Sequence, residues 1–175
     1  MKPLRSDEIR GNWTPLLLPV REDDSIDYAV LSDEIDVLIR ASVDGIYSNG
    51  TAGEFYTQTE EEYDRVNEIL AVACEARGVP FQIGASHMSP KISLERIRRA
   101  VRWRPSAIQV ILSDWFPLQT EEAVACLQRM AEAADGIGLV LYNPPHAKKV
   151  LEPATYAVLK AAVPGLVGVK VADGD

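Results

Sequence analysis

The sequence predicts an α/β fold of the (β/α)8 barrel type, of which these 175 residues cover about six βα units. Short apolar runs alternate with longer amphipathic stretches along the whole chain, as parallel strands and their crossover helices do. The first expected strand runs into Leu18 to Asp23 without a glycine. A doubly wound nucleotide-binding sheet usually carries a glycine-rich turn at this point, so the barrel is favoured.

The expected strands are short apolar segments bounded by turn residues, and the expected helices lie between them. The strands are predicted at Trp13 to Val20, Gly45 to Asn49, Phe81 to Ala85, Ala107 to Leu112, Gly138 to Tyr142 and Leu166 to Val171. The helices are predicted at about residues 26–43, 59–77, 92–104, 119–134 and 152–162.

Residues with strong boundary preferences mark the ends of these helices. Thr59 to Glu62 fits a capping box, in which the Thr59 hydroxyl accepts a hydrogen bond from the third helical amide. Thr120 and the acids after it fit the same pattern less well. Gly78 and Gly136 mark helix ends. The prolines that precede the next strands are Pro80, Pro105 and Pro164.

A closed barrel of this type needs eight strands and about 250 residues. We therefore expect a single β/α-barrel domain over residues 1–175 that is truncated after the sixth strand. If the chain ends at Asp175, the sheet is unclosed and its edge strands are exposed. Such a product is expected to self-associate or to be unstable.

The composition is that of an ordinary globular protein, 47% hydrophobic and 25% charged, with a formal net charge of -8. This apolar content argues against intrinsic disorder, and the longest apolar stretches fall short of the roughly 18 residues that span a membrane. The N-terminus lacks the apolar core of a secretory signal, so we expect a cytoplasmic protein. Cys74 and Cys126 lie in helical patterns and are predicted to be small buried residues, without a disulfide or a cysteine metal site.

The excess of acidic residues disfavours nucleic-acid binding, which depends on cations that neutralise phosphates. One basic cluster nevertheless runs from Lys91 to Arg104, where arginines interleave with apolar residues at helical spacing. The arginines are Arg96, Arg98, Arg99, Arg102 and Arg104. The pattern predicts an amphipathic helix with a solvated basic face, and a contact with nucleic acid or another subunit is the alternative.

In β/α barrels the reacting groups lie at the C-terminal ends of the strands. The second expected strand is followed by Gly50 to Glu54. Gly50 and Gly53 flank a hydroxyl residue and permit close backbone approach, and successive amides in such a turn can hold a carboxylate or an oxyanion. A plain loop that leads into the next helix explains the same residues equally well.

Two further strands end in residues suited to carbonyl chemistry. Tyr142 closes the fifth strand, either as a core residue or at the rim, where its hydroxyl can exchange protons. Lys170 lies in the apolar sixth strand, where lysine is rare. Desolvation lowers the pKa of an amine and favours the neutral form that makes Schiff bases. The alternative is a strand-end lysine that extends into solvent.

Taken together, Gly50-Thr51-Ala52-Gly53-Glu54, Tyr142-Asn143-Pro144-Pro145 and Gly168-Val169-Lys170 resemble the three signatures of the dihydrodipicolinate synthase and N-acetylneuraminate lyase family, in the same order and spacing. The resemblance runs from about Gly11 to the last residue. It implies a pyruvate-dependent class I aldolase on an eight-stranded barrel, usually a homotetramer, with no metal or organic cofactor.

The resemblance also implies a role for each matched residue. Lys170 would form a Schiff base with the keto group of a 2-oxo acid such as pyruvate, and Tyr142 would relay protons to the carbinolamine and the substrate. Thr51 would bind the substrate carboxylate and join the relay. The backbone amide of Ala52 would be a second carboxylate donor, in the turn that Gly50 opens. The partners implied are a 2-oxo acid and an aldehyde.

Three departures from the family pattern limit what the resemblance implies. Ala52 replaces the second hydroxyl of the usual Gly-Thr-Thr-Gly-Glu. Ser113 to Phe116 stand where the synthase has an aromatic pair, so the tyrosine that reaches a neighbouring active site is absent at its matched position. The arginine that receives the aldehyde's carboxylate falls at Ala147, and the adjacent Lys148 cannot offer the same planar fork. Pyruvate activation is therefore better supported than use of aspartate semialdehyde.

Two other functions remain open. A non-catalytic truncated homologue or oligomerisation partner would keep the motifs without turnover. A small-carboxylate-binding module would bind pyruvate reversibly, without covalent chemistry. The two histidines are too few for a histidine-rich metal site: His87 is predicted to be a loop residue, and His146 lies at the mouth of the expected site, where it could touch substrate.

Overall fold

Six parallel strands pair in the order in which they occur along the chain. The structure, a computed structural model, describes residues 1–113 and 115–171. The strands are β1 (Trp13–Pro15), β2 (Gly45–Ser48), β3 (Phe81–Gly84), β4 (Ala107–Val110), β5 (Leu139–Tyr142) and β6 (Leu166–Lys170). The helices are α1 (Tyr28–Arg40), α2 (Glu60–Arg77), α3 (Pro90–Val101), α4 (Thr120–Ala133) and α5 (Pro153–Ala162).

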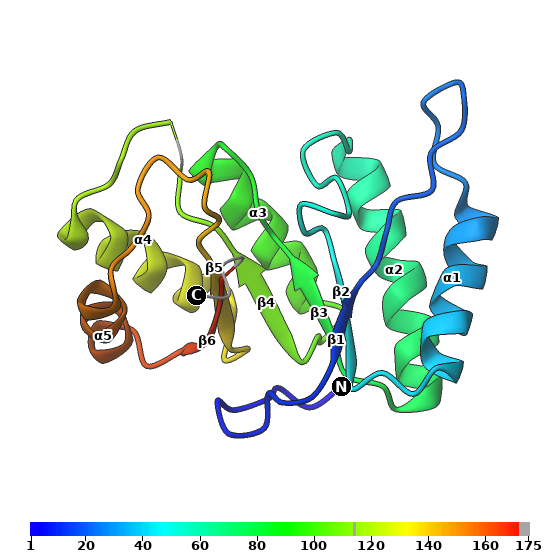
Figure 1. Ribbon diagram of the computed structural model, residues 1–175, viewed down its shortest axis with the longest axis horizontal. Coiled ribbons are helices and arrows are strands. Elements are labelled where there is room, and N and C mark those ends of the chain that lie inside the picture. Colours follow the sequence, from blue (N-terminus) through cyan, green and yellow to red (C-terminus); the bar gives the residue numbers. More distant parts are fainter. Residues whose placement is uncertain (114, 172–175) are drawn as a thin grey trace.

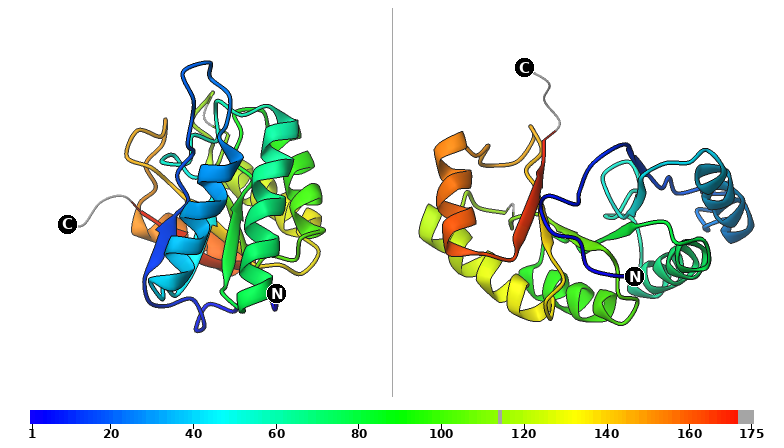
Figure 2. Two further views of the ribbon diagram at one scale, coloured as in Figure 1. Left: turned by 90° about the vertical axis from the view of Figure 1, so that its right-hand side faces the viewer. Right: turned by 90° about the horizontal axis from the view of Figure 1, so that it is seen from below.

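The sheet is curved, and the helices lie along its outer side. Figure 1 shows the strands beside one another, and the view from below in Figure 2 shows the helices in an arc outside them. The arrangement is a half-barrel of alternating strands and helices, so the predicted fold class is confirmed. Since a helix connects each strand to its parallel neighbour, the C-terminal ends of the strands meet at one edge of the sheet.

The two faces of the sheet differ in chemistry because successive side chains of a strand point to opposite faces. The face under the helices is apolar and fully buried, with Ile46, Ile83, Ile108, Leu139 and Leu141. Burying one such side chain contributes about 1.5–3 kcal/mol. The concave face instead carries Tyr47, Gln82, Gln109, Tyr142 and Lys170. The apolar face of the sheet therefore packs against the helices, and the polar side chains of the strands lie on the concave face.

The predicted capping box at the start of α2 is confirmed. The Thr59 hydroxyl accepts from the backbone N–H of Glu62 at 3.2 Å, and the Glu62 carboxylate accepts from the backbone N–H of Thr59 at 2.9 Å. The helix ends at Gly78 with φ of 68°, a left-handed conformation that glycine adopts without strain.

The boundaries predicted for α4 differ from those observed. Thr120 is the first helical residue and not the cap; the Glu122 carboxylate accepts instead from the backbone N–H of Gln119 at 2.8 Å. The helix ends at Ala133, and Gly136, with φ of 82°, lies beyond it in the turn that leads to β5.

The first strand is shorter than predicted, since it ends at Pro15 and not at Val20. The backbone N–H of Leu17 donates to the Glu34 carboxylate of α1 at 2.9 Å. The backbone N–H of Leu16 still donates to the carbonyl oxygen of Tyr47 in β2 at 2.8 Å, so the pairing with β2 ends just after the strand although the sequence stays apolar.

The prediction of a solvated basic face on α3 is wrong for Arg96, whose side chain is 1% exposed. Its guanidinium binds the Glu60 carboxylate of α2 at 2.7 and 2.9 Å. It also donates to the carbonyl oxygens of Ser86 at 2.8 Å and Phe55 at 3.3 Å. One buried side chain therefore holds together α2 and the loops that follow β2 and β3.

Two more arginines of the cluster face α2. Arg99 pairs with both Glu60 and Asp64, and Arg102 pairs with Asp64 at 2.8 Å. The two acids lie one turn apart on α2, and the periodicity of α3 by itself does not reveal them. Arg98 is exposed, as predicted.

Within the described residues, no helix is long and apolar enough to cross a membrane. Cys74 is buried and Cys126 half-buried, and both thiols are free. Burial raises the pKa of the Cys74 thiol to about 12, as expected for a packing residue.

The substitution Arg96→Met is expected to lower the free energy of unfolding by about 2–3 kcal/mol, because two carbonyl oxygens lose a buried donor. The Glu60 side chain is 41% exposed, so water can solvate the unpaired carboxylate and limit the loss. Arg98→Met is the matched control and should change stability by less than about 0.5 kcal/mol. Urea unfolding followed by circular dichroism measures both, and equal effects would contradict the anchoring role of Arg96.

Candidate active site

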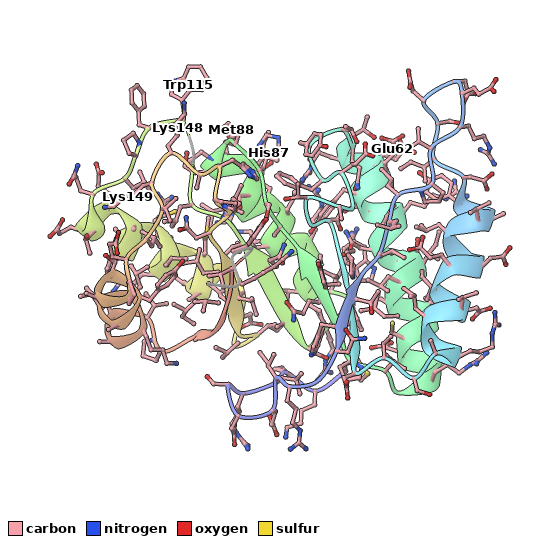
Figure 3. All side chains as sticks on the ribbon, viewed as in Figure 1. Glu62, His87, Met88, Trp115, Lys148 and Lys149 are labelled. Atoms are coloured by element: carbon pink, nitrogen blue, oxygen red, sulfur yellow. The ribbon has the colours of Figure 1, made fainter. Side chains whose placement is uncertain are left out.

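Side chains from distant parts of the sequence meet at the C-terminal edge of the sheet. Tyr142 and Lys170 are direct partners in the register of β5 and β6, and the Gly50 to Glu54 turn follows β2. Figure 3 shows His87, Met88, Trp115, Lys148 and Lys149 at the same end of the molecule. The loops after β3, β4 and β5 therefore lie at the same edge as the predicted site residues.

The Lys170 amine lies on the concave side between two aromatic rings. Its Nζ is 4.3 Å from the ring centre of Tyr142 and 4.4 Å from that of Tyr47, and it donates to the Tyr47 hydroxyl oxygen at 3.3 Å. The side chain is half-buried, and this desolvation lowers the pKa of the amine below its ordinary value. The neutral amine, which is the nucleophilic form, is therefore favoured relative to a lysine in water.

Tyr47 is a neighbour of the amine that the sequence analysis did not single out. Burial raises the pKa of its phenol, and the nearby Tyr142 adds to the effect. A signal was present in the sequence, because strand alternation places Tyr47 on the face opposite to Ile46 and Ser48. Ser48 indeed faces α2, where its hydroxyl donates to the Asn67 side chain at 2.6 Å.

Hydrogen bonds within the chain stabilise the Gly50 to Glu54 turn. The backbone N–H of Gly53 donates to the carbonyl oxygen of Gly50 at 3.1 Å, and that of Glu54 donates to Thr51 at 3.1 Å. Below the turn, the Asn49 amide donates to Gln58 at 2.7 Å, and Gln58 donates to the Gly53 carbonyl oxygen at 3.0 Å. The Gln58 side chain thus links the residue before the turn to a residue within it.

Two glycines let this turn approach its neighbours closely. A Cβ at Gly53 would lie 2.8 Å from the backbone oxygen of Leu16, which is closer than real contacts allow. A Cβ at Gly50 would lie 2.9 Å from the Tyr47 ring and 3.6 Å from Lys170 Nζ. Any side chain at position 50 would therefore fill the space beside the amine.

Thr51 and Tyr142 both line a cavity of about 160 Å³ at this edge. Its other walls come from the loops after β3, β4 and β5. The β5 loop is fastened by Asn143, whose side chain donates to the carbonyl oxygen of Lys149 at 3.0 Å and accepts from the backbone N–H of Leu151 at 2.7 Å. Lys170 is not among the lining residues, but its amine lies beside the Tyr142 ring.

Some of the other positions named in the sequence analysis line the cavity, and others lie outside it. His146 and Ala147 line the cavity. His87 lies in the loop after β3, as predicted, and its Nδ1 accepts from the backbone N–H of Ser89 at 2.9 Å. Burial lowers the pKa of its imidazole. Of Ser113 to Phe116, Asp114 lies outside the described residues, and Ser113 and Phe116 line the cavity.

Comparison with known proteins places the chain among related sequences. Residues 8–175 match the model of the dihydrodipicolinate synthetase family. The N-acetylneuraminate lyase of Escherichia coli is 27% identical over 168 residues, which are 95% of this chain and 56% of the lyase. The chain thus spans about half the length of the curated relatives that it matches.

Solved structures give the same picture of the fold. A dihydrodipicolinate synthase superposes with a TM-score of 0.84 at 26% identity, over 95% of this chain and 57% of the synthase. The N-acetylneuraminate lyase of Proteus mirabilis superposes with a TM-score of 0.86 at 24% identity, over 95% of this chain and 57% of the lyase.

The lowered pKa of Lys170 can be measured directly. Competitive labelling with acetic anhydride across a pH series, read by peptide mass spectrometry, is expected to give Lys170 a pKa below the roughly 10.4 of a free lysine side chain. N-acetyl-lysine amide in the same solution serves as the internal standard. A Lys170 labelling curve at or above that of the standard would contradict the desolvation of the amine.

Proposed function

The chain belongs to the dihydrodipicolinate synthetase family, and on that premise we propose that it carries the imine-forming half of a class I aldolase or lyase. The substrate is a 2-oxo acid such as pyruvate, and Lys170 is the nucleophile. The observation that carries the proposal is the half-buried amine between Tyr47 and Tyr142 at the end of β6. A lysine that served only solubility would extend into water instead.

Lys170 acts by attack of its neutral amine on the keto carbon of the 2-oxo acid. Addition gives a carbinolamine, and loss of water gives a protonated imine. This imine withdraws electrons from the neighbouring carbon, whose proton can then leave to form an enamine. Desolvation of the amine supports the first step because it raises the neutral fraction at a given pH.

The turn after β2 is the proposed site for the substrate carboxylate. No residue in the described part of the chain accepts a hydrogen bond from the backbone amides of Thr51 and Ala52. The Thr51 hydroxyl and these amides can therefore donate to a carboxylate, and the missing side chain at Gly50 leaves room beside Lys170. Ala52 contributes only its amide, because it lacks the hydroxyl usual in the family.

Tyr142 is the proposed proton relay. Its ring lies next to the Lys170 amine, and the residue also lines the cavity together with Thr51. A phenol in this place can pass a proton to the carbinolamine oxygen as water leaves. A neighbouring hydroxyl, for which Thr51 is the candidate, would complete the relay.

We further propose that residues 1–175 form one barrel-type domain, that the protein is cytoplasmic, and that it assembles as a homo-oligomer, with a tetramer as the form that the family resemblance implies. The family match over residues 8–175 supports the first point. The second substrate is proposed to be an aldehyde, as in the aldolases that the chain resembles.

Incubation with pyruvate followed by borohydride is expected to leave one reduced pyruvate adduct on Lys170, mapped by peptide mass spectrometry. Lys170→Met should abolish the adduct, and Lys91→Met, at an exposed position of α3, should keep it. Circular dichroism establishes that each sample is folded. A folded chain that binds pyruvate without an adduct would instead be a carboxylate-binding module, and one that does neither would be a non-catalytic homologue.

Tyr142→Phe is expected to slow the formation of this adduct by about 10²-fold or more, the usual range for loss of a general acid–base group. Tyr56→Phe is the matched control, because Tyr56 lies in the loop after β2 and is 63% exposed. Rapid quenching with borohydride at a series of times gives both rates. A Tyr142→Phe chain as fast as the control would remove Tyr142 from the relay.

A further inference from the structure

The cavity beside Tyr142 has a composition that bears on the second substrate. Its walls are mostly apolar side chains, among them Phe55, Met88, Leu112, Phe116 and Ala147. They come from the loops that follow β2, β3, β4 and β5. The cavity adjoins the amine's surroundings through Tyr142, which lines the cavity and whose ring centre is 4.3 Å from Lys170 Nζ.

Three polar side chains of the lining are already bonded to backbone. The Lys149 amine donates to the carbonyl oxygen of Leu118 at 2.9 Å, and the Ser113 hydroxyl donates to that of Met88 at 3.3 Å. The Asn143 side chain is bonded at both its nitrogen and its oxygen. None of the described lining residues is an arginine, so a charged ligand would lose hydration without the planar guanidinium that best replaces it, which is unfavourable.

The size of the cavity restricts the ligand further. Its volume of about 160 Å³ is close to the ~150 Å³ of an engineered apolar cavity that takes up benzene. The cavity therefore has room for one six-membered ring.

We propose that the second substrate is an apolar aldehyde of the size of one aromatic ring, bound in this cavity. The proposal rests on the proposed function of Lys170. The enamine carbon bonds to the aldehyde carbon, and the aldehyde oxygen takes up a proton and becomes a hydroxyl group. Water then hydrolyses the imine and releases a 4-hydroxy-2-oxo acid and the free amine. The reverse reaction cleaves such an acid to pyruvate and the aldehyde.

The test measures binding, so that it does not depend on turnover. The 175-residue chain is first treated with pyruvate and borohydride, and the adduct on Lys170 is scored by mass spectrometry. Ligand-observed NMR then compares two unreactive probes, benzyl alcohol for an aromatic aldehyde and 4-hydroxybutyrate for a carboxylated one. Benzyl alcohol is expected to bind at least about tenfold more tightly.

Ala147→Arg places a guanidinium in the cavity wall and is expected to reverse the order of the two probes. Ala154→Arg, at an exposed position of α5 outside the cavity, is the matched control and should leave the order unchanged. If the adduct forms but 4-hydroxybutyrate binds as well as benzyl alcohol, or if Ala147→Arg has no effect, the inference is overturned and the proposed function stands. If a folded chain forms no adduct, the proposed function fails, and the inference fails with it.

Discussion

The constraint on which the rest of the structure depends is the parallel pairing of six strands in chain order. Parallel neighbours need a crossover, and here every crossover is a helix on the outer side of the sheet. The helices bury the apolar face of the strands and leave the concave face free for polar residues. As a result, Thr51, Tyr142 and Lys170 come together although more than a hundred positions separate the first from the last.

This arrangement alone would leave the loops at the C-terminal edge loosely held, because a loop has no strand partner for its carbonyl oxygens. Arg96 of α3 supplies hydrogen-bond donors to two of these carbonyl oxygens. An arginine suits the position because its planar group can donate to a carboxylate and to two carbonyl oxygens together. Phe55, whose carbonyl oxygen it binds, also lines the cavity. The buried arginine therefore supports a wall of the candidate site from α3, without lying in the site.

Local features were predictable from the sequence, and contacts between distant elements were not. The capping box at Thr59 and the left-handed end at Gly78 depend on residues within one turn, so their chemistry can be read locally. The roles of Arg96 and Tyr47 depend on elements far along the chain. The spacing of the arginines predicts a helix with two faces, but it does not indicate that Glu60 and Asp64 lie opposite. The bond from the Leu17 N–H to the Glu34 carboxylate likewise joins the segment after β1 to another element, α1.

The candidate site also depends on Tyr142, which adjoins both the Lys170 amine and the apolar cavity. The Tyr142 ring lies next to the Lys170 amine, and the same residue lines the apolar cavity. Asn143 and the register with β6 fix the position of its backbone. The amine proposed to form the imine and the cavity proposed to bind the aldehyde are thus adjacent, and they share Tyr142. On these proposals, a change in the cavity wall, at Ala147 for example, alters which aldehyde binds without touching the amine. A site built in this way would retain the proposed reaction with the 2-oxo acid while the second substrate changes, because Tyr142 and Thr51 are the described residues that the two proposed parts share.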